Sequence, residues 1–164
     1  MKIVVCKMKK ITIIVIFFYS GLNLFAQDLP DELYMDAFVV VSDTSENYYY
    51  LRDKMFDLST ELKSKIDTMG RGFDDSKNLI CLSTNDEDKI YAGDYYPRRY
   101  SSETLSLEHL NYYLTGQKPN SSTMALVICI TDNREEAENK LAQLKLYSDD
   151  AFIIESRIYM GCMH

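Results

Sequence analysis

Short apolar runs alternate with amphipathic stretches along most of this chain. Four runs are almost continuously apolar, and they cover residues 37–41, 79–82, 125–130 and 151–155. Uninterrupted apolar runs of this length are typical of strands buried on both faces, whereas a strand with one face in water alternates. We therefore predict four buried strands.

Two amphipathic stretches lie between these strands. From Tyr48 to Met69, apolar residues recur at three- and four-residue steps with charged residues between them, and Gly70 follows. This spacing predicts a helix of about 20 residues that buries one face. The stretch from Glu135 to Lys145 predicts a shorter helix.

The order strand, helix, strand therefore occurs twice. In each half, an aspartate after the first strand (Asp43 and Asp132) is followed three residues later by a glutamate, a pattern that caps helix starts. Two such units interleave into a four-stranded antiparallel sheet with both helices on one face. We predict an α+β, ferredoxin-like fold, βαβ-(insertion)-βαβ, with residues 83–123 as the insertion.

A sheet of this kind needs a second cover, because its predicted strands are apolar on both faces. The insertion is the part of the chain that remains for this contact. Its apolar residues include Leu105, Leu107, Leu110 and Leu114. We expect the insertion to pack on the face opposite the helices.

The first 26 residues have the pattern of a secretory signal peptide. Four lysines precede an apolar run from Ile11 to Phe25, and Ala26 is a small residue before a polar turn. The run is about 15 residues, shorter than the roughly 20 that a spanning helix needs. We expect cleavage after Ala26 and a single exported domain at residues 27–164, in the periplasm or outside the cell. An uncleaved N-terminal anchor is the alternative.

The charge of the chain narrows the choice of partners. The formal net charge is −7 at pH 7, and loss of the signal peptide removes four lysines and no acid, which makes it −11. The negative charge of an acidic protein repels nucleic acids and anionic membranes, and so disfavours binding to either. It suits a soluble exported protein, or one that binds a basic protein.

Two segments in the second half of the chain have a pattern found in a known family. Residues 130–141 form a predicted helix start with an acid–alanine step, and residues 148–154 form an aspartate-rich turn that leads into a strand. Both segments resemble the second half of the SPOR family of small periplasmic domains. The resemblance implies binding to peptidoglycan glycan strands that lack stem peptides, on the exposed face of the sheet.

Tyrosines and arginines gather within the predicted insertion. Tyr95, Tyr96 and Tyr100 flank Arg98 and Arg99, the densest basic stretch after the signal peptide. Tyrosine offers a flat apolar ring with a hydroxyl, and arginine stacks on rings and binds carboxylates through two hydrogen bonds. We predict a binding site at these five residues. The alternative is that they attach the insertion to the sheet.

Sequence motifs for catalysis, metals or cofactors are lacking. No Gly-x-Ser-x-Gly, His-Glu-x-x-His or phosphate-loop pattern occurs, and His109 has no fixed nucleophile nearby. The acidic run at residues 85–88 lacks the spacing of an EF-hand loop, and Cys162 with His164 makes only two metal ligands. We therefore expect no metal, no cofactor and no enzyme activity.

Cys81, Cys129 and Cys162 remain after signal cleavage, so at most one internal disulfide is expected. Two of these cysteines lie in apolar runs, where buried thiols are the alternative to a disulfide.

These observations together favour an exported, non-catalytic binding module of the cell envelope that binds peptidoglycan glycan strands. An acidic protein-binding partner, such as an inhibitor or immunity-type protein, is the alternative, because acidic surfaces capture basic proteins quickly.

Overall fold

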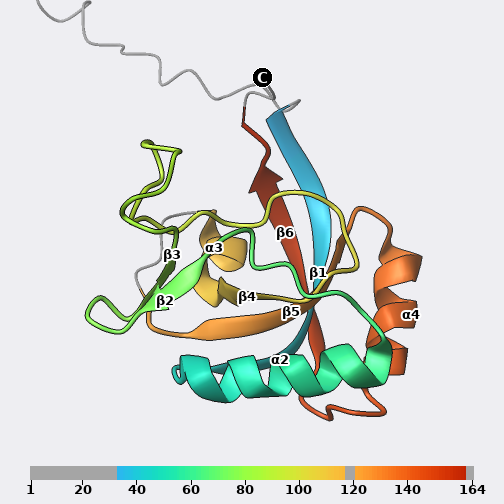
Figure 1. Ribbon diagram of the computed structural model, residues 1–164. Helices are drawn as coiled ribbons and strands as arrows, with labels where there is room; N and C mark the ends of the chain where they lie inside the picture. The colour runs from blue at the N-terminus through green and yellow to red at the C-terminus, as the bar shows by residue number, and fades with distance from the viewer. Residues whose placement is uncertain (1–32, 117–120, 162–164) are drawn as a thin grey trace, which may run out of the picture. The chain divides into compact units, whose positions relative to one another are not determined.

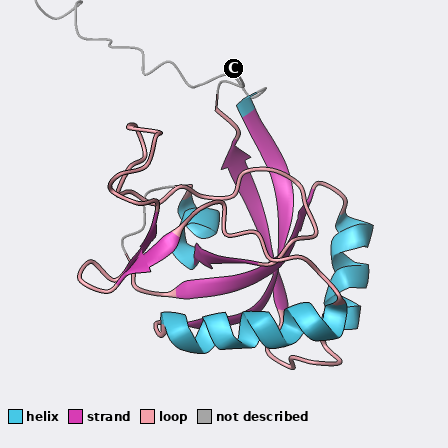
Figure 2. Cartoon of the chain, viewed as in Figure 1, coloured by secondary structure: helices cyan, strands magenta, loops and turns pink. Residues whose placement is uncertain are grey.

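The computed structural model describes residues 33–116 and 121–161, all within one compact unit of residues 31–164. Figures 1 and 2 show its elements, which in chain order are β1 (Tyr34–Ser45), α2 (Tyr48–Leu62), β2 (Gly72–Asp74), β3 (Leu79–Cys81), β4 (Ser106–His109), α3 (Leu110–Thr115), β5 (Met124–Thr131), α4 (Arg134–Leu144) and β6 (Phe152–Tyr159). Within these described ranges, no helix has the length and apolar character needed to cross a membrane. The predicted signal peptide lies outside them.

The main sheet has four antiparallel strands in the order β4-β5-β1-β6. Its central strands are β1 and β5, and the first strand of each half therefore lies beside the other, as two interleaved β-α-β units require. The predicted α+β fold, compatible with a ferredoxin-like description, is confirmed.

One predicted strand forms, but its predicted place in the four-stranded sheet is wrong. Residues 79–82 do not join the main sheet, because β3 pairs with β2 in a separate two-stranded hairpin. The strand that completes the first half is β4, which lies within residues 83–123, as does α3. Its sequence, Ser-Leu-Glu-His, carries three polar residues that are all buried, and a search for apolar runs passes over it.

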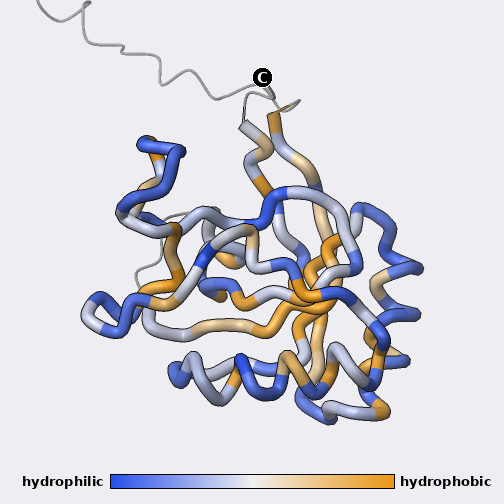
Figure 3. Tube along the Cα trace, viewed as in Figure 1, coloured by the Kyte–Doolittle hydropathy of each residue, from blue (hydrophilic) through white to orange (hydrophobic). Residues whose placement is uncertain are grey.

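Both faces of the main sheet are covered, as predicted. On one face α2 and α4 contribute to a core that includes Val40, Leu51, Met55, Leu58, Leu126, Ala137 and Leu144. On the other face Tyr113 of α3 packs in a core with Val39, Val41, Ala125, Val127, Ile154 and Ile158. Figure 3 shows the hydrophobic segments concentrated in the central strands.

The leucines expected to cover the second face divide between three environments. Leu105 and Leu107 belong to the core beneath α2 and α4. Leu110 packs on the opposite face, while Leu114 is 61% exposed. The cover on the second face therefore comes mainly from the aromatic residues of α3.

The helix boundaries also differ from the prediction. The side chain of Asn47 caps α2 and that of Asn133 caps α4, so neither predicted aspartate is the cap. Asp43 still lies in β1, where Lys54 and Tyr50 bind its carboxylate. Helix α2 ends at Leu62 rather than near Met69, because the next residue adopts a left-handed backbone conformation.

Candidate functional site

A buried ion pair lies beneath the loop that contains the predicted binding residues. Arg71, just before β2, donates from Nη2 to Oε1 of Glu108 at 2.7 Å and from Nη1 to Oε2 at 2.8 Å. The two side chains are 1% and 0% exposed. Such a two-point contact fixes both the distance and the plane of the guanidinium group.

Glu108 also accepts hydrogen bonds from two hydroxyl groups. Tyr95 donates to Oε2 at 2.7 Å and Ser106 donates to Oε1 at 2.6 Å. Burial alone would raise the pKa of Glu108, but the charge and hydrogen bonds of Arg71 outweigh burial and lower the pKa to about 2. The carboxylate is therefore ionised at every physiological pH.

The same buried groups hold the backbone of residues 95–100. Arg71 donates from Nη1 to the carbonyl oxygen of Tyr96 at 2.8 Å, and the hydroxyl of Tyr113 donates to the carbonyl oxygen of Arg98 at 2.9 Å. The backbone N–H of Arg98 points to Glu108. Interactions from β4, α3 and the segment before β2 thus converge on one loop.

Two of the five predicted binding residues face inward. The hydroxyl of Tyr95 donates to Glu108 and also accepts from the backbone N–H of His109. Arg98 is 0% exposed, and its Nη1 donates to the carbonyl and hydroxyl oxygens of Thr104. These two residues attach the loop to the sheet, which is the alternative role considered for them.

The other three predicted residues reach the surface. Tyr100 is 42% exposed and donates a hydrogen bond to Asp67. Tyr96 and Arg99 are both half-buried. The guanidinium of Arg99 lies over the Tyr96 ring, 5.1 Å from its centroid.

Two further tyrosines complete this surface. The Tyr91 ring lies 4.7 Å from that of Tyr96 at an angle of 58°. Tyr112 packs edge-on against Tyr95, and burial raises the pKa of Tyr112 while the charge of Arg99 opposes that rise. We refer to Tyr91, Tyr96, Arg99 and Tyr112 as the arginine–tyrosine cluster. Neither Tyr91 nor Tyr112 is among the five residues predicted to bind, although both are tyrosines close to them in sequence.

The charge of Arg99 is stabilised without a carboxylate. Burial disfavours the charge, but the interactions with Tyr96 and Tyr91 outweigh it and raise the pKa of Arg99. Within residues 33–116 and 121–161, no carboxylate forms an ion pair with this guanidinium. The cluster therefore presents a positive charge framed by tyrosines.

His109 is a structural residue of this region. Its Nε2 accepts the backbone N–H of Ile80 at 3.1 Å and so links β3 to β4, and its ring packs edge-on against Tyr95. Burial lowers the pKa of His109 to about 4, so the imidazole is neutral at pH 7.

Sequence reasoning missed Arg71 and Glu108. Glu108 is a charged residue in a short stretch whose apolar neighbours predict a strand or a helix. Arg71 lies between two glycines. An ionisable residue inside a segment whose neighbours are buried signals a buried partner. The partner itself is 37 residues away and cannot be identified from the sequence.

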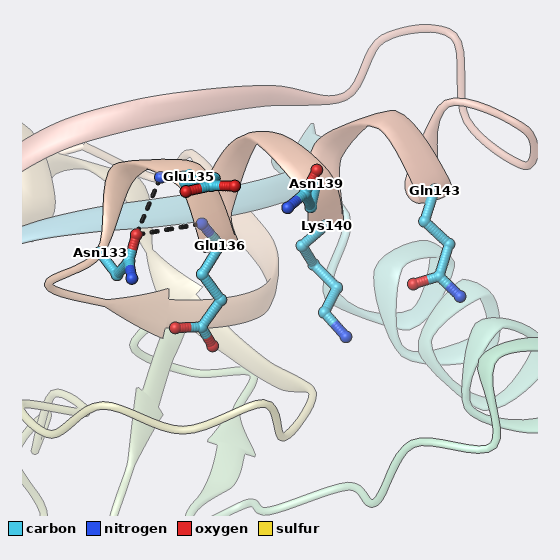
Figure 4. Close-up of a pocket in the computed structure, with 6 residues that line it drawn as sticks. All are labelled: Asn133, Glu135, Glu136, Asn139, Lys140 and Gln143. Atoms are coloured by element: carbon cyan, nitrogen blue, oxygen red, sulfur yellow. Dashed lines mark hydrogen bonds between the residues drawn. The ribbon is translucent and has the colours of Figure 1, made fainter.

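An open polar hollow runs along the outer side of α4 (Figure 4), lined by Asn133, Glu135, Glu136, Asn139, Lys140 and Gln143. Asn133 is used as the helix cap, and Lys140 forms an ion pair with Glu103. Glu136 accepts a hydrogen bond from Thr131, so three of the six lining side chains already serve contacts within the fold.

The described residues hold no group of three or more potential metal ligands. Cys81 and Cys129 are buried thiols that form no disulfide there. Cys162 and His164 lie outside the residues that the structure describes.

No protein-family model, curated protein or solved structure matches this chain.

Proposed function

We propose that this protein is a non-catalytic binding module of the cell envelope that binds peptidoglycan glycan strands through the arginine–tyrosine cluster. The observation that carries the proposal is the anchoring of residues 95–100. Buried Arg71 and Tyr113 hold the loop backbone, while Tyr96 and Arg99 reach the surface. Side chains on a loop held in this way lose little conformational freedom when a ligand binds.

The ionisable groups beneath the cluster support a binding role. A general base needs an accessible group whose pKa lies near the working pH. Glu108 is fully buried with a pKa of about 2, and the Nε2 of His109 already accepts a backbone N–H. Both groups hold structure together, so neither is suited to proton transfer.

The proposed site lies at the rim of the fold and not on the face of the sheet. The SPOR resemblance implies the exposed sheet face, but α3 packs on the face opposite α2 and α4. The cluster is beside this helix, because Tyr112 belongs to α3. The envelope location in the proposal rests on the signal-peptide pattern of residues 1–26.

The proposal is tested by sedimentation with purified peptidoglycan, with and without amidase treatment to remove stem peptides. We expect the protein to be retained, and Tyr96→Ala to weaken retention about fivefold through the loss of one aromatic contact. Tyr50→Ala removes an exposed tyrosine from α2 and is the matched control. Absence of retention on both preparations overturns the glycan proposal, and equal losses in the two variants overturn the site.

Capture of a basic protein is the second candidate function, favoured by exposed acids on two helices. Asp57 and Glu61 on α2 and Glu135 on α4 are exposed and form no ion pair with a described residue. Unpaired surface acids speed encounters with basic proteins at low salt.

Affinity capture from lysate at low and high salt separates the two functions. A basic partner that is lost at high salt and weakened by Asp57→Asn with Glu135→Gln supports the second candidate. A glycan signal that these substitutions leave unchanged, with no basic partner captured at low salt, argues against it.

A further inference from the structure

We propose that the arginine–tyrosine cluster is a carboxylate-binding site, in which Arg99 recognises the acidic group of a sugar. This inference rests on the proposed function, because it assigns the ligand chemistry of the same site.

Arg99 differs in its partners from four of the other described arginines. Arg52, Arg71 and Arg134 each form an ion pair with a carboxylate. Arg98 is fully buried and bonded to Thr104. Arg99 reaches solvent, and among residues 33–116 and 121–161 no carboxylate forms an ion pair with it.

The guanidinium of Arg99 is also held in a defined place. One face lies over the Tyr96 ring, and the backbone at Gly161 passes so close that a Cβ there would lie 3.4 Å from Nη1. Gly161 has a φ of +71°, a conformation that side chains other than glycine's rarely adopt. Stacking on one face leaves the N–H groups at the edge of the guanidinium, which is the side that binds a carboxylate through two hydrogen bonds.

The charge of the whole protein selects a ligand with one negative charge. A chain of net charge −7 repels polyanions at long range, and the cluster supplies only one cation. A single carboxylate on an otherwise neutral molecule satisfies Arg99 without that repulsion. A nucleic acid or a polyphosphate does not.

The body of the ligand is better matched by a sugar than by a peptide. Peptides are held largely through backbone hydrogen bonds. In this loop the carbonyl groups of Tyr96 and Arg98 and the N–H of Arg98 already have buried partners. What the cluster offers is rings and hydroxyls from three tyrosines, which suit the apolar faces and hydroxyls of a sugar.

A titration with two related sugars tests the inference on the full chain. N-acetylmuramic acid carries a carboxylate on a lactyl ether, and N-acetylglucosamine is the neutral sugar without it. Followed by NMR, the acidic sugar is expected to bind at least about tenfold more tightly, the value of one good charge-assisted contact. Tri-alanine and inorganic phosphate are titrated in parallel as a peptide carboxylate and a second kind of anion.

Variants identify the residue responsible. Arg99→Ala is expected to remove the preference for the acidic sugar, and Arg99→Lys to keep part of it, because lysine retains the charge without the planar fork. Arg52→Ala is the matched control, since Arg52 lies at the same 5.1 Å over a tyrosine ring on α2. Arg99 is only half-buried, and circular dichroism checks that each variant is folded.

Several results overturn the inference. These are equal affinity for the two sugars, an unchanged preference in Arg99→Ala, the same loss in Arg52→Ala, or tighter binding of tri-alanine or phosphate. If the sugar preference is missing while the protein still sediments with peptidoglycan, only this inference fails. If sedimentation fails as well, the proposed function fails with it.

Discussion

Glu108 accepts hydrogen bonds from Arg71, Tyr95 and Ser106 at a position that solvent does not reach. A buried ion pair adds little net stability compared with apolar residues, because both charges lose their hydration. Removing one partner strongly lowers stability, since the other charge stays buried without a partner. The pair therefore makes the loop above it intolerant of single substitutions.

Glu108→Ala is expected to lower the free energy of unfolding by about 3–5 kcal/mol, because Arg71 stays buried without its carboxylate. Urea denaturation followed by circular dichroism measures the loss. Glu103→Ala is the control, since Glu103 forms an exposed pair with Lys140 and should cost no more than about 1 kcal/mol. Similar losses in the two variants would contradict the role given to the buried pair.

The stability of the protein is expected to fall in two stages on acidification. The pKa of His109 is lowered from 6.5 to about 4, so the unfolded chain takes up its proton first and stability is lost as the pH falls from 6.5 to 4. The pKa of Glu108 is lowered from 4.5 to about 2, so its contribution is present above pH 4.5 and is lost as the pH falls toward 2.

Denaturation curves from pH 7 to pH 3 check this order of events. His109→Gln keeps an acceptor for the N–H of Ile80 but cannot titrate, so it should flatten the dependence between pH 6.5 and 4 and leave the lower stage intact. An unchanged slope above pH 4.5 in this variant would show that another group is responsible.

Among the residues, the sequence predicted a binding site at residues 95–100 but did not show which of these side chains face outward. Residues 95–100 carry no strand or helix period, and periodicity is what reveals a buried face. The inward positions of Tyr95 and Arg98 follow instead from Glu108, a contact between segments that only the folded chain brings together.

At the scale of the elements, a local sequence pattern locates the start of a helix only approximately, as the cap of α4 shows. Asn133 accepts hydrogen bonds from the N–H groups of Glu135 and Glu136, while the predicted cap Asp132 lies one residue before it. Aspartate and asparagine are equally good caps, so the pattern alone could not choose between neighbours.

Asn133→Ala is expected to destabilise the protein by about 1 kcal/mol, because two N–H groups at the start of α4 lose their acceptor. Asp132→Ala should change the unfolding free energy by less than about 0.5 kcal/mol, as an exposed position outside the cap does. Thermal and urea denaturation of both variants checks the assignment, which a reversed ranking would refute.

The strands of the main sheet also show what a local sequence pattern misses. Apolar runs identified β1, β5 and β6, which fill the centre and one edge of the main sheet. The other edge is β4, whose Ser106, Glu108 and His109 are polar residues buried by one another and by Arg71. A strand stabilised by a polar network has no apolar signature in the sequence.

At the scale of the whole molecule, the twofold β-α-β order was sufficient to predict the fold class, because few topologies join two such units into one sheet. The role of residues 83–123 was harder to predict. This segment supplies β4, α3 and the arginine–tyrosine cluster, so it completes the domain as well as carrying the candidate site.

Deletion of residues 84–122 is therefore expected to give an insoluble protein, because it removes an edge strand and uncovers the sheet beneath α3. Replacing residues 85–89 with glycine and serine changes a stretch that is mostly exposed, and it should leave solubility and cooperative unfolding intact. Solubility and thermal unfolding of both variants provide the check. A soluble, cooperatively folding deletion variant would show that the segment is peripheral.

The separation of Arg71 and Glu108 along the chain has a consequence for the order of folding. Their contact closes a loop of 37 residues, and the charges gain from burial only after β4 has joined the sheet. The pair should therefore form after the rate-limiting barrier, with a φ-value near zero. In stopped-flow experiments Glu108→Ala should greatly increase the unfolding rate constant and hardly change the folding rate constant. The ion pair would then prolong the lifetime of the native state by slowing its unfolding.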